Sequence, residues 1–475
     1  MAFRLRPVSD ASEDFRPLAL LVGSAMFMEQ LDATIISPVI PQIALQYGID
    51  PLGLNLTMTI YLLCSLIFIP LSGLFAARWG SRTTFCGSVL LFVISSVLCA
   101  MSTSVEALAA SRGLQGAAAA MMVPVGRNVL IHAVGKGKLV QALAWMVTPA
   151  MLGPMLGPPL GGILGTYLSW HWVFWANVPV GLAGLWAARY VMPELRTRIS
   201  SVFDWGEWLL LSAILALIVI GVESVRQADD PLWLFAWVLA LTGLLVFYIH
   251  YRRHLAHPML DFSLLQGKSF SAGFWGGSLV RVGYGALPFL LPLMLQLGLG
   301  FSAVQSGMVL LLSGTVAFFA KTQTAKMLGR WGFRRMLIGN GLMCTAGLLA
   351  CACFALPGWN MIAISLVMAL TGFFRAIQFN ALSAIAYADL PAEKVASATT
   401  LNTMAWQLAV TVGIAFSALL IEWSATWASR AEPASADYAI AFGLLALCCA
   451  AAIPCYRSLP EHAGQELSGH TPRVS

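Results

Sequence analysis

The chain alternates between long apolar stretches and short polar connections over almost its whole length. Each stretch is long enough to cross a hydrocarbon core of about 30 Å at about 1.5 Å per residue. The pattern therefore predicts an all-α polytopic membrane protein with fourteen transmembrane helices. We expect these helices at residues 18–45, 54–77, 83–101, 105–132, 139–168, 172–192, 205–224, 231–250, 269–298, 302–327, 336–356, 359–388, 395–423 and 438–456.

Composition agrees with this prediction, because 59% of the 475 residues are hydrophobic and only 10% are charged. Ordinary soluble domains have about 25% charged residues, so too little polar sequence remains here to coat a water-soluble core. The first stretch is too long for a signal peptide, and no small-residue cleavage site follows it.

The positions of Lys and Arg predict the orientation. Most of the 27 basic residues fall in the tails and in alternate loops, such as those around Arg78 and Arg334, whereas the opposite loops carry Arg226 and Arg430. Basic residues concentrate on the cytoplasmic side of membrane proteins. We therefore expect both termini in the cytoplasm, and we interpret the net charge of +6 as topological, with no nucleic-acid partner.

Two loops on the predicted cytoplasmic side resemble each other: AARWGSR at 76–82 and LGRWGFRR at 328–335. Each follows an even-numbered helix of its half of the chain, so the two loops indicate an internal repeat. We predict two six-helix halves, 18–193 and 269–456, joined by residues 194–268 with two inserted helices, and cytoplasmic tails at 1–17 and 457–475. Paired repeats around a central site are a transporter design.

Several other kinds of chemistry lack their sequence signals. All nine cysteines lie in apolar stretches with no histidine cluster nearby, which predicts small apolar residues and no metal site. The run GKGK at 135–138 lacks the spacing of a phosphate-binding loop, so ATP-driven transport would need another subunit. A membrane enzyme would need a nucleophile and base deep in the membrane, and no histidine lies at the core of a predicted helix. A scaffold or receptor would leave the buried charges without a purpose.

Three charged residues lie deep inside predicted helices of the first half. Glu29 and Asp32 occur in MFMEQLDATIISPVIP, and Arg112 occurs in LAASRGLQGAAAAMM. Asp32 and Arg112 lie about 18 Å and 10 Å from the outer ends of their helices, which places them at similar depths. Charges inside membrane helices usually face a partner or a wet cavity. The pair is either a proton-handling site or a structural ion pair, and Glu29 either couples to Asp32 or only faces the inner vestibule.

The fifth predicted helix contains MLGPMLGPPLGGIL at 151–164. Prolines remove backbone donors and bend a helix, and glycines permit close packing. This density of both predicts a bent, closely packed gate helix. The residues concerned are Gly153, Pro154, Gly157, Pro158, Gly161 and Gly162.

These segments together resemble the fourteen-helix drug:proton antiporter family of the major facilitator superfamily (EmrB/QacA type). LDATIISPVIP resembles its helix 1 motif, RGLQG its helix 4 motif, and GPMLGPPLGG its antiporter motif, followed by WHWVFWANVPVG at 170–181. The resemblance implies that Asp32 is a proton-coupling acid whose protonation Arg112 influences. It also implies that a proton gradient, with no cofactor, drives export.

The loop after the second helix departs from the family pattern G-x-x-x-D-R-x-G-R-R. Here GLFAARWGSR keeps Gly73, Arg78, Gly80 and Arg82 but has Ala77 at the acidic position. The family uses that acid in a charge latch that stabilises the outward-open state, and the sequence leaves open whether this chain has the latch.

The second half contains two deep cations, Arg281 and Arg375, and neither has an acidic residue within four positions on its own helix. We interpret them as a cationic cavity wall suited to an anionic or zwitterionic amphiphile. The alternative is that they bind backbone carbonyls or lipid headgroups. Further polar or aromatic candidates for the cavity are Gln378, Asn402, Gln407 and Trp145.

We therefore predict a monomeric secondary transporter of the bacterial cytoplasmic membrane that exports amphiphilic solutes or drugs in exchange for protons. The alternatives are proton-coupled uptake and export of one anionic metabolite. The sequence leaves open the identity of the substrate, the proton stoichiometry and the involvement of a periplasmic accessory protein.

Overall fold

The computed structural model describes residues 14–134, 138–195, 203–225, 231–255, 258–391, 394–430 and 432–468, and these residues form helices and connections without a strand. Arg226 and the outer parts of both predicted tails lie outside the described residues. The helices are α1 (Arg16–Ile35), α2 (Ile40–Tyr47), α3 (Asn55–Trp79), α4 (Ser81–Ala100), α5 (Val105–Ala133), α6 (Leu139–Tyr167), α7 (Trp172–Trp175), α8 (Asn177–Val191), α9 (Trp205–Val225), α10 (Pro231–Arg252), α11 (Lys268–Ser271), α12 (Gly277–Gly285), α13 (Leu287–Leu293), α14 (Ala303–Ala352), α15 (Met361–Ile385), α16 (Val395–Trp427), α17 (Ser435–Ala450), α18 (Ile453–Arg457) and α19 (Gln465–Ser468).

Eleven helical stretches of the described residues are long and apolar enough to cross a membrane. One of them, Ala303–Ala355, covers two predicted segments, 302–327 and 336–356. Helix α14 departs from helical geometry at Gly332, where φ is 69° and ψ is 168°. Glycine adopts a positive φ without steric cost, so the chain changes direction there. The predicted segments 139–168 and 172–192 form α6 and the pair α7 and α8.

Several predicted helices are interrupted by short turns of other types. The first predicted segment contains α1, a 3₁₀ turn at Ser37–Val39 and α2, and proline stands at the start of both later pieces. The predicted segment 269–298 contains two π-turns, Ala272–Gly276 and Met294–Gly298, on either side of α12 and α13. Proline at a first helical position cannot donate to the preceding turn, so each of these prolines begins a new piece.

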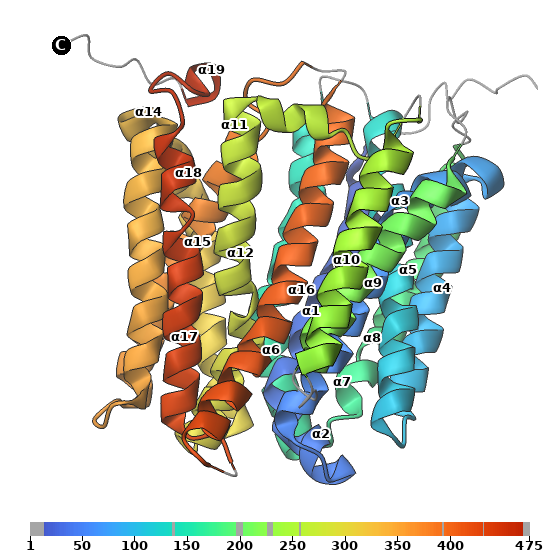
Figure 1. Cartoon of the computed structure of the whole chain (residues 1–475). Coiled ribbons are helices and arrows are strands. Elements are labelled where there is room, and N and C mark those ends of the chain that lie inside the picture. The colour runs from blue at the N-terminus through green and yellow to red at the C-terminus, as the bar shows by residue number, and fades with distance from the viewer. Residues whose placement is uncertain are drawn as a thin grey trace, which may run out of the picture.

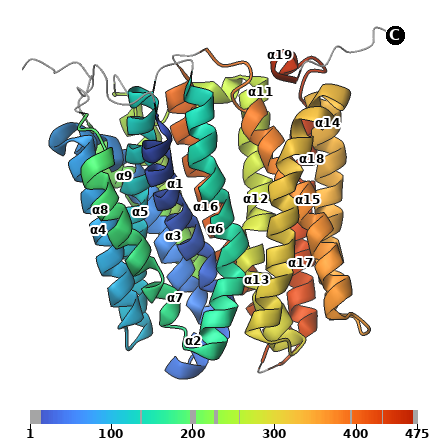
Figure 2. The same cartoon turned by 180° about the vertical axis from the view of Figure 1, so that it is seen from behind.

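Figures 1 and 2 show two helix bundles side by side, one built from α1 to α8 and the other from α11 to α18. Helix α9 packs against both, since one apolar cluster contains Leu66 of α3, Leu215 of α9 and Leu401 of α16. Two hydrogen bonds attach α9 to α3: the Trp208 indole donates to the carbonyl of Ile67 at 2.9 Å, and the Asn55 amide donates to Glu223 at 2.8 Å. The inserted helix α9 therefore lies where the two bundles meet.

The bundles also touch at the end of the molecule where α2 lies, which is the lower end in Figure 1. The Ser37 hydroxyl donates to the carbonyl of Pro288, and the Gln296 amide donates to the carbonyl of Pro38 at 2.9 Å. Residues from α1 to α2 thus bind residues from α13 onward, and this contact joins the two bundles at one end.

Candidate functional site

The two charged residues of the first bundle form a buried ion pair. Arg112 Nη1 lies 2.5 Å from Asp32 Oδ2, and the two side chains are 1% and 0% exposed. Helix α1 supplies the acid and α5 supplies the base. Asp32 and Arg112, which the sequence placed at similar depths, are therefore in direct contact.

Two neutral amides complete the hydrogen bonding of Asp32. Its Oδ1 accepts from Gln115 Nε2 at 2.9 Å and from Asn177 Nδ2 at 2.6 Å. Gln115 also accepts from Arg112 Nη1 at 2.6 Å and donates to the Ser96 hydroxyl at 2.8 Å. Sequence reasoning singled out the motifs that contain Gln115 and Asn177 but did not identify these amides as partners of Asp32. Helices α1, α5 and α8 thus meet at one carboxylate, and α4 joins this network through the bond between Ser96 and Gln115.

Aromatic rings enclose the Arg112 guanidinium. Its Cζ lies 4.3 Å from the centre of the Tyr61 ring and 5.8 Å from that of Phe174. Among the described residues, Arg112 Nε has no hydrogen-bond partner. Because hydrogen bonds and charges interact more strongly away from water, a proton placed on Asp32 would weaken the pair and release Arg112 for another partner. The arrangement can therefore convert proton binding into a change of helix contacts.

Glu29 lies one turn from Asp32 on α1 and is partly exposed. Its nearest charged or polar neighbours include Gln30 and Asp32, and the ion pairs of the described residues do not include it. Glu29 therefore lies close to the buried ion pair but forms no ion pair itself with the described residues.

The predicted gate segment forms part of α6, which is helical from Leu139 to Tyr167 through four prolines. One glycine face packs on α1: a Cβ on Gly153 would lie 2.7 Å from Gln30 Cβ, while Gly157 and Gly161 approach Thr34 and the carbonyl of Ile35. The other face packs on α14, where a Cβ on Gly162 would lie 2.5 Å from the carbonyl oxygen of Ala303. Pro158 lies on this second face, and Pro154 is exposed.

In the second bundle, Arg281 of α12 is 9% exposed and lies against two aromatic rings. Its Cζ is 3.6 Å from the centre of the Trp406 ring and 4.3 Å from that of Phe379. Arg281 Nη1 donates to the carbonyl of Gly277 at 3.2 Å. Arg375 of α15 is partly buried near Tyr284. The structure thus brings Arg281 of α12 together with Trp406 of α16.

The other predicted cavity residues lie apart from one another. Gln378 is fully buried between α14 and α15, where it accepts from Asn340 at 2.8 Å and donates to the carbonyl of Leu337. Asn402 is buried and donates to the Tyr387 hydroxyl at 3.3 Å. Gln407 is partly buried on α16, and Trp145 is exposed on α6 beside Arg16.

The loop between α3 and α4 packs against the segment that follows α8. Gly80 has a φ of 89°, and the carboxylate of Glu194 lies directly against it. Ser81 N donates to the carbonyl of Leu195 at 3.0 Å, and Arg82 donates to the carbonyl of Arg189. Gly73 and Arg78 are exposed, and Ala77 is partly buried.

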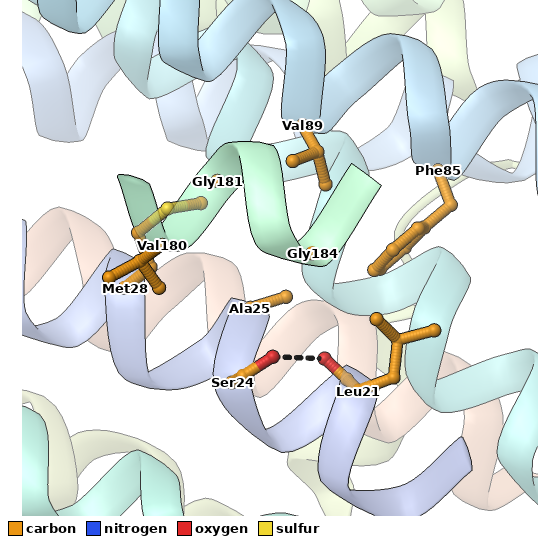
Figure 3. A pocket seen from close by; sticks show the side chains of 9 residues that line it. All are labelled: Leu21, Ser24, Ala25, Met28, Phe85, Val89, Val180, Gly181 and Gly184. Atoms are coloured by element: carbon orange, nitrogen blue, oxygen red, sulfur yellow. Dashed lines mark hydrogen bonds between the residues drawn. The ribbon is translucent and has the colours of Figure 1, made fainter. Parts of the chain in front are cut away.

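A small pocket lies between α1, α4 and α8. Figure 3 shows its lining, in which Met28 and Val180 lie at one end and Leu21 at the other. Ser24 has the one polar side chain of this lining, and its hydroxyl donates to the carbonyl of Leu21 at 2.8 Å. The pocket offers an apolar surface about one turn from Asp32 and Asn177.

Comparisons with known proteins agree on one family. The sequence model of the Major Facilitator Superfamily matches residues 22–414 and 273–473. A protein of Cronobacter sakazakii named for multidrug resistance, MdtD, is 32% identical over 415 residues, covering 87% of this chain and 88% of that protein. MdtD of Klebsiella pneumoniae is 31% identical over 447 residues, covering 94% of each chain.

Two solved structures share the fold at low identity. The nucleoside transporter NupG has a TM-score of 0.65 at 12% identity and covers 93% of this chain and 99% of its own. The human organic anion transporter MFSD10 has a TM-score of 0.62 at 17% identity and covers 94% of this chain and 100% of its own. These likenesses concern the fold alone.

Proposed function

Because the chain belongs to the Major Facilitator Superfamily, we propose that it is an antiporter that exports amphiphilic organic solutes, drugs among them, in exchange for protons. Relatives that are 31 to 32% identical over most of the chain are named for multidrug resistance. Many apolar helices make it a multi-pass membrane protein. We place it in the bacterial cytoplasmic membrane, acting as a monomer driven by the proton gradient.

The observation that carries the proposal is the buried cluster around Asp32. An ion pair deep in a membrane protein costs desolvation free energy, and a purely apolar core would avoid that cost. The Asp32 carboxylate joins α1 to α5 through Arg112 and Gln115, and to α8 through Asn177. Binding and release of one proton at this carboxylate would change several helix contacts together, which is what coupling to a conformational change requires.

The proposed topology has fourteen spans arranged as six, two and six, with both termini in the cytoplasm. Helical segments at all predicted positions and the change of direction at Gly332, inside a basic loop, support this count. The halves would be residues 18–193 and 269–456, with 194–268 between them. In this orientation the α2 end faces outward, so the contact between the bundles there corresponds to an inward-facing state.

The test measures efflux of a fluorescent drug from proteoliposomes under an imposed pH gradient. The parent should move the dye when the gradient is present, and Asp32→Asn should abolish gradient-driven movement while retaining the elution profile of the folded protein. Asp32→Glu retains a carboxylate and should keep part of the coupling. If Asp32→Asn transports as well as the parent under the gradient, the proposal of coupling through Asp32 is wrong, and Glu29→Gln becomes the next variant.

Proton-coupled uptake is the alternative within the same fold. Sided vesicles distinguish the two, because export and uptake move the dye in opposite directions under the same gradient. The glycine- and proline-rich α6 favours export, since the resemblance to antiporters rests on that segment.

A further inference from the structure

Arg281 is a buried cation without a counter-charge among the described residues. Its side chain is 9% exposed, and the ion pairs of the described residues do not include it. A guanidinium has five N–H donors, and Arg281 makes one hydrogen bond, to the carbonyl of Gly277. Arg112, by contrast, has both Asp32 and Gln115 as partners. An unpaired buried charge is costly, so binding of an anionic group would stabilise Arg281 in this position.

A second unpaired donor lies beside this guanidinium. The indole Nε1 of Trp406 is buried and has no hydrogen-bond partner among the described residues. A Cβ added to Gly277 would lie 2.6 Å from Trp406 Nε1 and 3.3 Å from Arg281 Nη1. Both nitrogen atoms therefore lie beside Gly277, and the missing side chain of this glycine provides the room for them.

The aromatic contacts fix the guanidinium from two other helices. Trp406 of α16 and Phe379 of α15 both lie within cation–π distance of Arg281 Cζ. The planar N–H fork of an arginine matches the oxygens of carboxylate and phosphate groups. The geometry is therefore that of a preorganised site for an acidic group.

Arg375 adds positive charge about one turn away. It precedes Phe379 by four residues on α15, and Tyr284, which lies near Arg375, follows Arg281 by three residues on α12. The Tyr284 and Phe379 rings are 6.4 Å apart, so these turns of α12 and α15 face each other. Two cations that have no paired acid within the described part of the chain thus lie along one contact between helices.

We propose that Arg281 and Trp406 Nε1, beside Gly277, bind the acidic group of an amphiphilic anion. The statement that this anion is a transported solute rests on the proposed export function. The same chemistry would bind a phospholipid phosphate, so the experiment separates these two sources.

The experiment measures binding of two xanthene dyes, anionic fluorescein and cationic rhodamine 123, to the full chain in phosphatidylcholine nanodiscs by fluorescence anisotropy. Arg281→Gln should weaken fluorescein binding about tenfold or more, because the variant loses a charge-assisted, bidentate hydrogen bond to the dye. Rhodamine binding should stay unchanged. Trp406→Phe, which keeps a ring but removes the N–H, should weaken fluorescein binding by roughly threefold. Lys321→Gln removes an exposed cation from α14 and should change neither dye.

Unchanged fluorescein affinity in Arg281→Gln would overturn the proposal. If that variant does not fold, Arg281→Lys and Trp406→Phe carry the test, and parent-like fluorescein affinity in both would overturn the proposal as well. Replacing part of the phosphatidylcholine with anionic phosphatidylglycerol identifies the occupant. Competition with fluorescein in the parent supports an anionic lipid headgroup at the site. Absence of competition, together with fluorescein binding in pure phosphatidylcholine, whose own phosphates then do not occupy the site, supports a soluble anion.

Binding in nanodiscs requires no proton gradient. Loss of fluorescein binding in Arg281→Gln would therefore support the anion site even if Asp32→Asn transported normally and the proposed coupling were wrong. Conversely, normal coupling together with unchanged fluorescein binding in the Arg281 variants would refute the anion site alone.

Discussion

Among single residues, Asp32 has more hydrogen-bond donors around it than an ion pair requires. Arg112, Gln115 and Asn177 all donate to its two oxygens. Each donor comes with its own orientation constraint, and the amides are in turn held by Ser96 or by the start of α8. A network of this kind is more cooperative than its separate pairs, so its members should behave as a unit when mutated.

The pair Asp32 and Arg112 should therefore show strong coupling in a double-mutant cycle. Asp32→Asn and Arg112→Gln each leave one uncompensated buried charge, whereas the double variant leaves neither. We expect the double variant to be about 2 kcal/mol or more stable than the sum of the single losses predicts. Thermal unfolding of the purified variants in one detergent measures this difference. Additive losses would mean that the two charges do not stabilise each other in the folded protein.

The sequence predicted that Asp32 and Arg112 lie at similar depth, but it did not predict which amides surround them. Depth follows from counting residues along a helix. Which neighbour a side chain meets depends on how each helix is rotated, and the apolar pattern of a buried membrane helix fixes that rotation only weakly. Gln115 and Asn177 could have been suspected only as the polar members of otherwise apolar motifs.

Among the helices, α6 shows that prolines alone do not predict a break. Pro38 and Pro288 begin new helical pieces, yet α6 continues through Pro149, Pro154, Pro158 and Pro159. Each proline removes one backbone hydrogen bond. In α6, close contact with α1 and α14 through its glycine faces holds the helix between its neighbours. The sequence therefore predicted the extent of the helices well and their interruptions poorly, because tolerance of a proline depends on what packs around it.

The glycine face of α6 that packs on α1 gives a prediction for one residue. Gly161→Val places a branched side chain against the backbone carbonyl of Ile35, which cannot rotate away. Overpacking of this kind costs about 1–3 kcal/mol, and the melting temperature should fall accordingly. Gly184→Val on α8 is the matched control, because nothing lies within 4 Å of its added Cβ. Equal melting temperatures for the two variants would show that the contact between α6 and α1 contributes little.

For the whole molecule, the two similar loops occupy equivalent places in the two bundles. Gly80 and Gly332 both have a positive φ, and each loop meets an acid that follows the last helix of its bundle. Glu194 lies against Gly80, and Glu461 lies 3.6 Å from Arg334. The repeat in the sequence therefore predicted related loops. It contained no information on which end of the molecule is closed, because that depends on contacts between the bundles.

At the α2 end, the backbones of α6 and α14 are in close contact. We therefore predict that disrupting this contact changes the ratio of closed to open molecules. A Cβ on Gly307 would lie 2.5 Å from the carbonyl oxygen of Pro158 and 2.9 Å from Pro159 Cα, and both of these are backbone atoms. Gly307→Val should therefore penalise the closed arrangement by about 1–3 kcal/mol. That free-energy difference changes the ratio of closed to open molecules by roughly five- to 150-fold.

Spin labels at two exposed positions of the α2 end measure this ratio. Leu45 on α2 and Trp427 at the end of α16 are 85% and 81% exposed and belong to different bundles. The labels are placed in a background without the nine native cysteines, all of which are free thiols.

Gly307→Val should shift the distribution of distances between the two spin labels towards longer separations. Gly339 lies in the part of α14 that follows Gly332, with nothing within 4 Å of its added Cβ, and Gly339→Val should leave the distribution unchanged. Because Gly307 contacts neither Asp32 nor the anion site, a shift confined to Gly307→Val would assign closure to backbone packing between the bundles. An unchanged distribution in folded Gly307→Val would instead assign it to the hydrogen bonds of Ser37 and Gln296.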